Sequence, residues 1–181
     1  MKFHVVPVKL FVAVIGAPVV LTVVLALGLL AVLAPGGEAM PVGPAATPAA
    51  VADIPPDMLR LYVSAAGRCP GLPWTVLAAI GKVETDHGRG PEVSPAGAEG
   101  PMQFMPATWA RYGVDGDGDG VASVWDAADA VPAAADLLCA NGGGDPAQLQ
   151  SAIFQYNHDD AYVALVLAWA QRYAVSVPTP A

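Results

Sequence analysis

The chain has no charged residue between Lys9 and Glu38, and residues 10–34 of this stretch are almost wholly apolar, which limits what the N-terminal part can form. About 20 apolar residues are enough for a helix to cross the hydrocarbon core of a membrane. Because the positive charges of Lys2 and Lys9 precede this stretch, we expect residues 1–9 to be cytoplasmic and the remainder to be exported. The sequence therefore predicts a single-pass transmembrane anchor at 10–34. A cleaved signal peptide, which would leave the protein secreted, is the alternative, although its apolar core usually has only about 7–15 residues.

The rest of the chain divides by composition. Residues 35–52 are mainly Pro, Ala and Gly, which is typical of a semi-extended linker. Residues 53–175 are long enough for one domain, and residues 176–181 form a Pro-containing tail that we expect to be loose. The chain has 16 acidic and 8 basic residues, a balance that argues against a nucleic-acid-binding protein, since such proteins need a basic patch. We expect a monomer without a nucleic-acid partner.

Two cysteines, Cys69 and Cys139, both lie in the predicted outer domain. In an exported protein, such a pair meets an oxidising compartment and usually forms a bridge. Two buried thiols are the alternative. There is no C-x-x-C motif or Cys/His cluster, so the sequence does not support a zinc site.

Gly and Pro residues separate the outer domain into short helical segments, and no segment shows the strict alternation of a half-buried strand. Proline is tolerated in the first turn of a helix, where its missing N–H would have had no partner. The sequence therefore predicts an all-α domain with long loops at 88–105 and 113–126. The expected helices span about 55–67, 73–87, 106–112, 127–140, 146–157 and 161–173.

The second of these helices contains the first chemical signal. Leu77, Ile80 and Glu84 are spaced i, i+3 and i+7, so the carboxyl of Glu84 continues an apolar helix face. Desolvation on that face, and the negative end of the helix dipole, both raise the pKa of a carboxyl group. A carboxylic acid that stays protonated near neutral pH is suited to general acid catalysis. Taken alone, Glu84 could equally be a solvated residue at a fraying helix end.

The loop after Glu84 strengthens the catalytic interpretation. Glu84-Thr85 is followed ten residues after Glu84 by S-P-A-G-A-E-G-P-M-Q-F-M-P, and A-I-F-Q-Y-N occurs at 152–157. Together these blocks resemble the signature of the lytic transglycosylases, lysozyme-like enzymes that cleave bacterial peptidoglycan. The similarity covers about 71–173 and is closest to the branch that contains the membrane-bound transglycosylase B enzymes. Pro101 replaces the usual Leu, and Thr85 replaces the commoner Ser; neither change removes a catalytic group.

The resemblance implies a single acid/base, Glu84. It would protonate the glycosidic oxygen between N-acetylmuramic acid and N-acetylglucosamine, and then accept the proton of the muramic C6 hydroxyl as a 1,6-anhydro ring closes. The nucleophile belongs to the substrate, so no second carboxylate is required. The resemblance also implies substrate-binding residues, namely Ser94, Met102, Gln103, Tyr156 and Asn157.

A second motif lies in the loop at 113–126. The spacing fits the calcium-binding loop D-x-D-x-D-G-x5-[DE], in which alternate carboxylates converge on one ion. Packed carboxylates repel one another without a cation, so we expect a structural Ca²⁺ and no organic cofactor. A metal-free Asp/Gly turn is the alternative. The expected ligands are Asp115, Asp117, Asp119, the carbonyl of Val121, Ser123 and Asp126.

The sequence thus predicts an exported, membrane-tethered lytic transglycosylase that acts on peptidoglycan glycan strands. Two other functions fit the same motifs. One is a hydrolase of the goose-type lysozyme kind, in which water is the nucleophile. The other is a non-catalytic, calcium-stabilised module that binds glycans.

Overall fold

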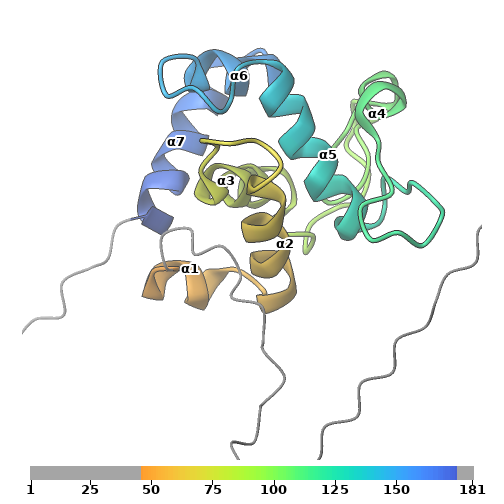
Figure 1. The fold of residues 1–181 in the computed structure, drawn as a ribbon, viewed down its shortest axis with the longest axis horizontal. Helices are drawn as coiled ribbons and strands as arrows, with labels where there is room; N and C mark the ends of the chain where they lie inside the picture. Colours follow the sequence, from red (N-terminus) through yellow and green to blue (C-terminus); the bar gives the residue numbers. More distant parts are fainter. Residues whose placement is uncertain (1–45, 175–181) are drawn as a thin grey trace, which may run out of the picture. The chain divides into compact units, whose positions relative to one another are not determined.

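The computed structural model describes residues 46–174 (Figure 1). The predicted cytoplasmic N-terminus, the anchor at 10–34, most of the linker and the tail lie outside the described residues. Within the described part, none of the helices combines the length and the apolar character that crossing a bilayer requires.

Seven helices make up the described part, which has isolated β-bridges but no strand. The all-α prediction is therefore confirmed for this part of the chain. The helices are α1 (Pro48–Asp53), α2 (Pro56–Ala66), α3 (Trp74–Thr85), α4 (Pro106–Tyr112), α5 (Ala127–Ala140), α6 (Leu149–Tyr156) and α7 (Asp160–Ala174).

Helix α1 occupies residues that the sequence assigned to the linker. Thr47 is its N-cap and accepts a hydrogen bond of 3.1 Å from the backbone N–H of Ala50. Ala50 is fully buried, and Ile54 directly after the helix is 2% exposed. The folded region therefore begins several residues before the predicted boundary at 53.

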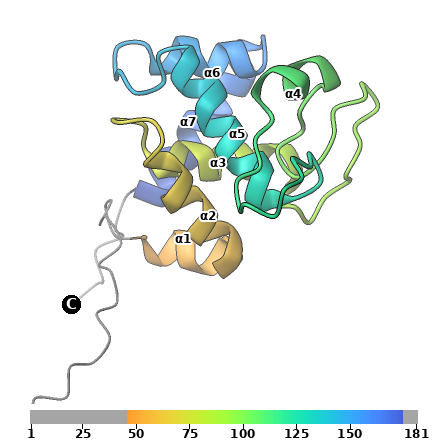
Figure 2. The same ribbon diagram turned by 45° about the vertical axis from the view of Figure 1, so that its right-hand side comes forward.

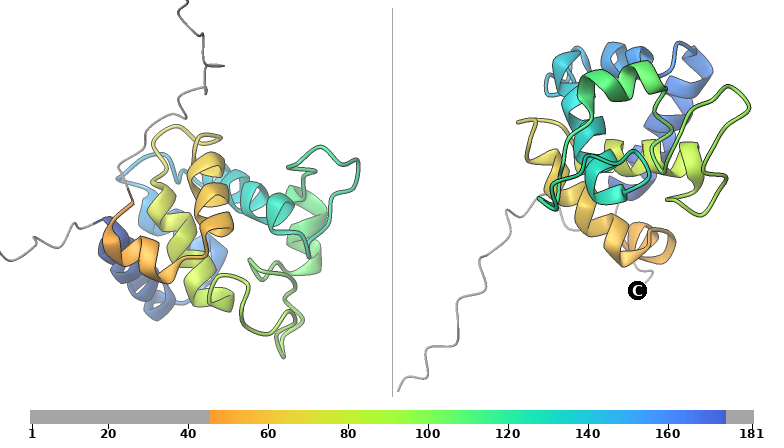
Figure 3. Two further views of the ribbon diagram at one scale, coloured as in Figure 1. Left: turned by 90° about the horizontal axis from the view of Figure 1, so that it is seen from below. Right: turned by 90° about the vertical axis from the view of Figure 1, so that its right-hand side faces the viewer.

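Helix α3 is the central element of the core. It contacts α2, α5 and α7, and most of its residues, from Trp74 to Gly81, are buried (Figure 2). Burial of this kind is the main source of folding free energy, at about 25 cal/mol per Å² of apolar surface. The two long loops lie with α4 on one side of these helices (Figures 2 and 3). The last turn of the best-packed helix therefore faces the loops that carry the sequence motifs.

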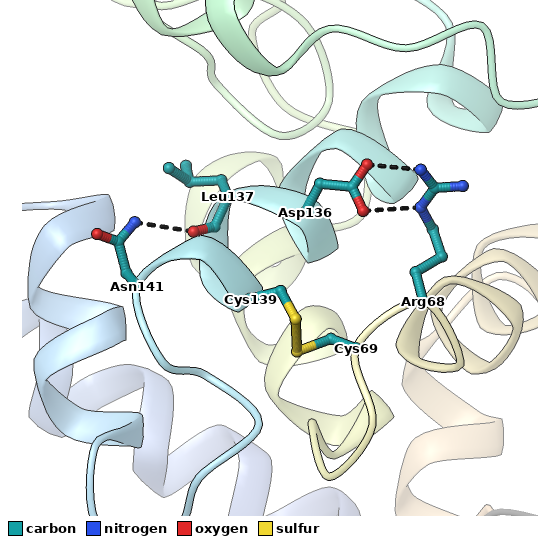
Figure 4. The surroundings of a disulfide bond; sticks show 6 residues. All are labelled: Arg68, Cys69, Asp136, Leu137, Cys139 and Asn141. Atoms are coloured by element: carbon teal, nitrogen blue, oxygen red, sulfur yellow. Dashed lines mark hydrogen bonds and ion pairs between the residues drawn. A yellow bond between two sulfur atoms is a disulfide. The ribbon is translucent and has the colours of Figure 1, made fainter.

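A disulfide between Cys69 and Cys139 joins the α2–α3 connection to the last turn of α5, as predicted (Figure 4). Its neighbour Arg68 forms a bidentate ion pair with Asp136, with Nε–Oδ1 and Nη2–Oδ2 distances of 2.9 and 2.5 Å. Paired hydrogen bonds of this type are strong and directional. Closure of the 70-residue loop stabilises the fold by about 4 kcal/mol in the chain-entropy model.

Candidate active site

Glu84 lies in the last turn of α3, half-buried against α7. Tyr162 is a buried residue, 8% exposed, and its hydroxyl donates a hydrogen bond of 2.6 Å to Oε1 of Glu84. Burial raises the pKa of Glu84 to about 7, and the Tyr162 hydrogen bond opposes this rise. Near neutral pH, the carboxyl therefore exists in both protonation states, as a group that first gives and then takes a proton requires.

Tyr156 and Met102 lie close to this carboxyl. Tyr156 donates its hydroxyl proton to the carbonyl oxygen of Met102 over 2.8 Å, and the Met102 side chain is fully buried. Burial raises the pKa of Tyr156 well above its usual value, and the charge of Glu84 adds to that rise. Phe104 connects this pair to α4, because its ring packs against both Tyr156 and Trp109. The glycan-binding candidates Met102 and Tyr156 are thus brought together beside Glu84.

Ser94 and Gln103 both stabilise the loop that follows α3. The hydroxyl oxygen of Ser94 accepts the N–H of Ala98 at 3.0 Å, which leaves its own proton available to a ligand. Gln103 has a positive φ of 51°, and its side-chain amide donates to the carbonyls of Gly100 and Glu92. These bonds occupy both N–H groups of the amide, so its oxygen is the atom that remains for a ligand.

Asn157 is the exposed C-cap of α6. Within the described residues its side chain has no hydrogen-bond partner, so the structure leaves both its donor and its acceptor open to solvent.

Thr85 fixes the turn that follows Glu84. Its hydroxyl donates to the carbonyl of Pro101 over 2.7 Å and accepts the N–H of Gly88 over 2.8 Å. A pocket of about 230 Å³ beside this turn is lined by Thr85, Glu92 and Pro101 among others, and Glu84 is not part of its lining. The role of Thr85 is thus to tie the end of α3 to the motif loop.

His87 is a buried residue that the sequence interpretation left without a function. Its Nδ1 lies 3.1 Å from the hydroxyl of Tyr62, and its Nε2 lies 3.1 Å from the hydroxyl of Tyr173. Tyr173 donates its only proton to Oδ2 of Asp53 at 2.6 Å. Although burial alone would raise it, hydrogen bonds from Lys82 and Tyr173 hold the pKa of Asp53 below its usual value, so this acceptor is ionised.

These contacts determine the direction of every hydrogen bond in the series that runs from Tyr62 through His87 and Tyr173 to Asp53. Because the Tyr173 proton goes to Asp53, Tyr173 must accept from Nε2–H of His87, and Nδ1 must accept from Tyr62. Burial lowers the pKa of His87 to about 4, so the ring is neutral at pH 7. Gly81 makes the arrangement possible, since a Cβ there would collide with the Tyr62 hydroxyl. Residues from α1, α2 and α7 thus hold the turn that starts two residues after Glu84.

The acidic loop is ordered by its own carboxylates. Asp115 accepts the backbone N–H groups of Gly118, Asp119 and Gly120, and Asp119 accepts that of Val121. Such contacts fold the segment into successive tight turns.

The carboxylates that the loop brings together differ from the expected set. One oxygen atom each from Asp115, Asp117 and Asp129 lie within 4.8 Å of one another. Asp126 instead caps α5, accepting the N–H of Ala128 at 2.8 Å. Asp129, which the sequence interpretation missed, is only 1% exposed and accepts the N–H groups of Gly116 and Ser123. The acidic cluster therefore joins the loop to the first turn of α5.

Residues 81–150 match the family model described as the transglycosylase SLT domain, a range that includes Glu84, the motif loop and the acidic loop. Over these residues the chain is similar to the transglycosylase SLT domain. The predicted resemblance to the lytic transglycosylases is thereby confirmed.

A curated relative of the SLT domain is the membrane-bound lytic murein transglycosylase B of Escherichia coli strain K12, which is 45% identical over 47 residues. That match covers 26% of this chain and only 13% of the relative, so the chain corresponds to a small part of that protein.

Solved structures share the fold of the SLT domain. The Escherichia coli lytic transglycosylase SLT35 in complex with calcium aligns with a TM-score of 0.54 and 20% identity, over 70% of this chain and 77% of that one. The same enzyme in complex with bulgecin A aligns with a TM-score of 0.53 and 20% identity, over 70% and 76% of the two chains. The expected lysozyme-like helical fold is therefore confirmed.

Proposed function

We propose that this protein is a lytic transglycosylase that cleaves the β-1,4 bond between N-acetylmuramic acid and N-acetylglucosamine in peptidoglycan, with Glu84 as its single acid/base. One observation carries the proposal: Glu84 is half-buried in an SLT domain, has a pKa of about 7 and receives a hydrogen bond from Tyr162. A group with these properties can supply a proton at neutral pH and recover one in the same turnover.

The hydrogen bond from Tyr162 assigns the two oxygens of Glu84 to different tasks. Oε1 accepts the Tyr162 proton, so the acidic proton of Glu84 resides on Oε2. In the first step Oε2–H protonates the glycosidic oxygen, and the bond from that oxygen to C1 of the muramic acid breaks. In the second step the muramic C6 oxygen bonds to C1, and Oε2 accepts the C6 hydroxyl proton. Glu84 ends as it began, and no water is consumed.

The surroundings of Glu84 favour this reaction over hydrolysis by two carboxylates. Glycosidases of that kind place a second carboxyl group about 5–9.5 Å from the acid. Burial raises the pKa of Glu84 and the hydrogen bond from Tyr162 lowers it, so the group that touches this carboxyl is a tyrosine hydroxyl and not a second carboxyl group. Ser94, Gln103 and Asn157 retain free polar atoms, and we assign these, together with Tyr156, to binding of the glycan. Met102, whose side chain is fully buried, supports this surface by accepting the hydroxyl proton of Tyr156.

Digestion of purified peptidoglycan by the full chain tests the proposal, with the fragments identified by mass spectrometry. We expect products that end in 1,6-anhydromuramic acid. A goose-type lysozyme reaction would give reducing ends that are heavier by one water. A glycan-binding module would release no fragments, and its binding would persist in the variant Glu84→Gln.

We also propose a structural calcium ion held by Asp115, Asp117 and Asp129. Carboxylate oxygens are the ligands that Ca²⁺ prefers, and a divalent cation would relieve the repulsion among three carboxylates whose oxygens lie within 4.8 Å. The related SLT35 structure was solved with calcium, which supports the same assignment here. The ion would fasten the loop at 113–126 to α5; it takes no part in the proton transfers.

The proposed location is the outer face of the cell membrane, with residues 10–34 as a single-pass anchor and a monomeric catalytic domain outside. The Cys69–Cys139 disulfide supports export, because such bonds persist in oxidising compartments. Membrane fractionation, followed by protease treatment of intact cells, tests this location. Recovery of the whole protein in the culture medium would instead indicate a cleaved signal peptide.

A further inference from the structure

A second polar pocket, of about 280 Å³, lies between α4, α5 and α6, away from Glu84. Its side walls include Tyr112 and Leu137. Besides Tyr112, four of its lining residues carry hydrogen-bonding side chains, namely Thr108, Arg111, Asn141 and Gln155. None of the lining residues is acidic, although the described residues include 15 of the chain's 16 acidic residues. Arg111 is therefore the one charged residue among those that line this pocket, in a domain that is acidic as a whole.

Arg111 supplies the positive charge of this pocket. Its guanidinium carbon lies 5.1 Å from the centre of the Tyr112 ring, so the cation is held over an aromatic face. Within the described residues no carboxylate lies within ion-pairing distance of it. By contrast, four other cations of the described chain have carboxylate partners, namely Arg60, Arg68, Lys82 and Arg89. Arg111 is thus exposed and free to pair with an external anion.

The other polar groups add donors beside the guanidinium. Thr108 precedes Arg111 by one turn of α4, so both side chains lie on the same helix face. Asn141 uses one N–H to donate to the carbonyl of Leu137 at 2.8 Å, which leaves its second N–H for a ligand (Figure 4). Gln155 on α6 is exposed and offers another amide. A guanidinium fork with neighbouring hydroxyl and amide donors is suited to bind a carboxylate through paired hydrogen bonds.

Two of the helices that form this pocket are close in sequence to the glycan-binding candidates: α4 follows Met102 and Gln103, and α6 contains Tyr156. Helix α4 begins at Pro106, directly after the segment that contains Met102 and Gln103. Gln155 immediately precedes Tyr156 on α6. The ring of Phe104 bridges the two helices by packing against Trp109 of α4 and Tyr156 of α6. A substrate that lies along Tyr156 therefore has its substituents within reach of a neighbouring surface of α4 and α6.

We propose that this pocket binds a carboxylate of the peptide stem that the muramic acid residues of the glycan carry. The inference rests on the proposed function, because it takes peptidoglycan as the substrate. The stem is joined by an amide to the lactyl carboxyl of the muramic acid and carries free carboxylates farther along the peptide, whereas the sugars of an intact strand carry no charge of their own. Arg111 then selects peptide-bearing strands over bare ones and does not act on the bond that is cleaved.

Kinetics on two substrates test this inference: glycan strands with their stems, and the same strands after an amidase has removed the stems. The amidase leaves a lactyl carboxylate on each muramic acid, so the two substrates differ in where their carboxylates lie, along the stem or next to the sugar ring. We expect the full chain to have a lower KM for the peptide-bearing strands. Arg111→Ala should reduce that preference by about 10-fold, as expected for loss of a charge-assisted bidentate contact. Arg111→Lys should restore only part of it, because an ammonium lacks the planar fork. A reduction confined to kcat, or an equal rise of KM for both substrates, would overturn the inference.

Arg172→Ala is the matched control. Arg172 is likewise stacked over an aromatic ring, at 5.0 Å from the centre of Trp169, and has no carboxylate partner within the described residues. It does not line the pocket. We expect this variant to keep the wild-type preference, and loss of the preference would attribute the effect to charge in general.

A binding measurement separates failure of this inference from failure of the proposed function. Calorimetric titration of the Glu84→Gln protein with a soluble muropeptide needs no turnover, and we expect Arg111→Ala in that background to weaken binding about 10-fold. Absence of turnover by the wild-type protein, with this Arg111-dependent binding intact, would refute the enzyme proposal alone. Unchanged muropeptide affinity in the Arg111→Ala protein would refute the carboxylate site alone.

Discussion

Tyr162 of α7 donates its hydroxyl proton to Oε1 of Glu84, 78 residues earlier in the chain, over 2.6 Å. The bond crosses the contact between α3 and α7, which are the most extensively packed pair of helices in the described domain. The packing of the core therefore sets the orientation of the proposed acid, and the carboxylate formed after the first proton transfer already has a donor in place.

Replacing the acid is the first test. We expect Glu84→Gln to lower the release of anhydro-muropeptides by at least about 1,000-fold, because general acid–base catalysis contributes up to about 10⁴-fold and the amide cannot supply it. The variant should remain folded, with a melting temperature no lower than that of the wild type, since Gln is isosteric with Glu. Glu92→Gln, a change in a nearby exposed carboxylate of the motif loop, is the control and should keep most of the activity. Substantial turnover by Glu84→Gln would contradict the assignment.

The Tyr162 bond makes a separate prediction for the pH profile. The first step needs protonated Glu84, so activity should fall as the pH rises through its pKa of about 7. The hydroxyl of Tyr162 stabilises the charged form and so lowers this pKa. Tyr162→Phe should therefore move the alkaline limb to higher pH and reduce the maximal rate by about 10-fold. Tyr112→Phe, on α4, should leave the limb in place. A shift of the alkaline limb to lower pH in Tyr162→Phe would contradict the assignment of Tyr162 as the residue that lowers the pKa of Glu84.

The same carboxyl should cost the protein stability in alkaline solution. A group whose pKa is raised on folding contributes its full stability below its unfolded pKa, near 4.5, and loses it as the pH rises through the folded value near 7. We expect Glu84→Gln to unfold like the wild type at pH 4, and to be more stable by about 3 kcal/mol at pH 8. Urea denaturation at the two pH values measures the difference. Equal stabilities at pH 8 would mean that Glu84 is hydrated in the folded state.

Two acidic residues distinguish the calcium site in the structure from the one expected from the motif. We expect Ca²⁺ to raise the melting temperature and a chelator to lower it. Asp129→Asn should abolish this response, because Asp129 belongs to the cluster of carboxylates. Asp126→Asn should retain it, since asparagine is also a good N-cap for α5. If Asp126→Asn abolished the response and Asp129→Asn retained it, Asp126 would be the ligand. A wild-type melting temperature that does not change with Ca²⁺ would refute the calcium site.

The chain of hydrogen bonds through His87 should make that residue important for stability. His87→Ala leaves the hydroxyl of Tyr62 without its acceptor in the core, and we expect a loss of about 3 kcal/mol in the free energy of unfolding. His87→Gln keeps one donor and one acceptor and should recover part of the loss. His158→Ala, a change in an exposed histidine, is the control. Equal losses for the Ala and Gln variants would show that ring packing, and not the hydrogen bonds, is what matters.

The helices were largely predictable because proline and glycine mark their ends. Helix α4 and helix α5 have the predicted bounds, and α2 and α3 agree within about two residues. Helix α6 begins three residues later than expected, since Asp145 accepts the N–H of Ala147 and holds a turn there. Helix α1 was missed because its Ala- and Pro-rich sequence resembles a linker. Only its burial against the domain distinguishes it.

The candidate site was predictable only where its residues form local motifs. Glu84 could be found from its helix face and the loop that follows. Tyr162 and His87 could not, because their partners lie on other helices and no spacing in the sequence encodes those contacts. Asp129 lies beyond the last position of the calcium-loop template. The position of Asp126 directly before a helix was nevertheless a readable signal that it would serve as an N-cap.

Helix α1 has a practical consequence for anyone who prepares a shortened form of this protein. The helix ends at Asp53, whose carboxylate receives the protons of Tyr173 and Lys82. A truncation that starts at Pro55, where the sequence predicts the first helix, would delete Asp53 and with it the acceptor of the hydrogen-bond network behind Glu84. A shortened form should start upstream of Thr47, so that it keeps helix α1 together with its N-cap and the carboxylate of Asp53.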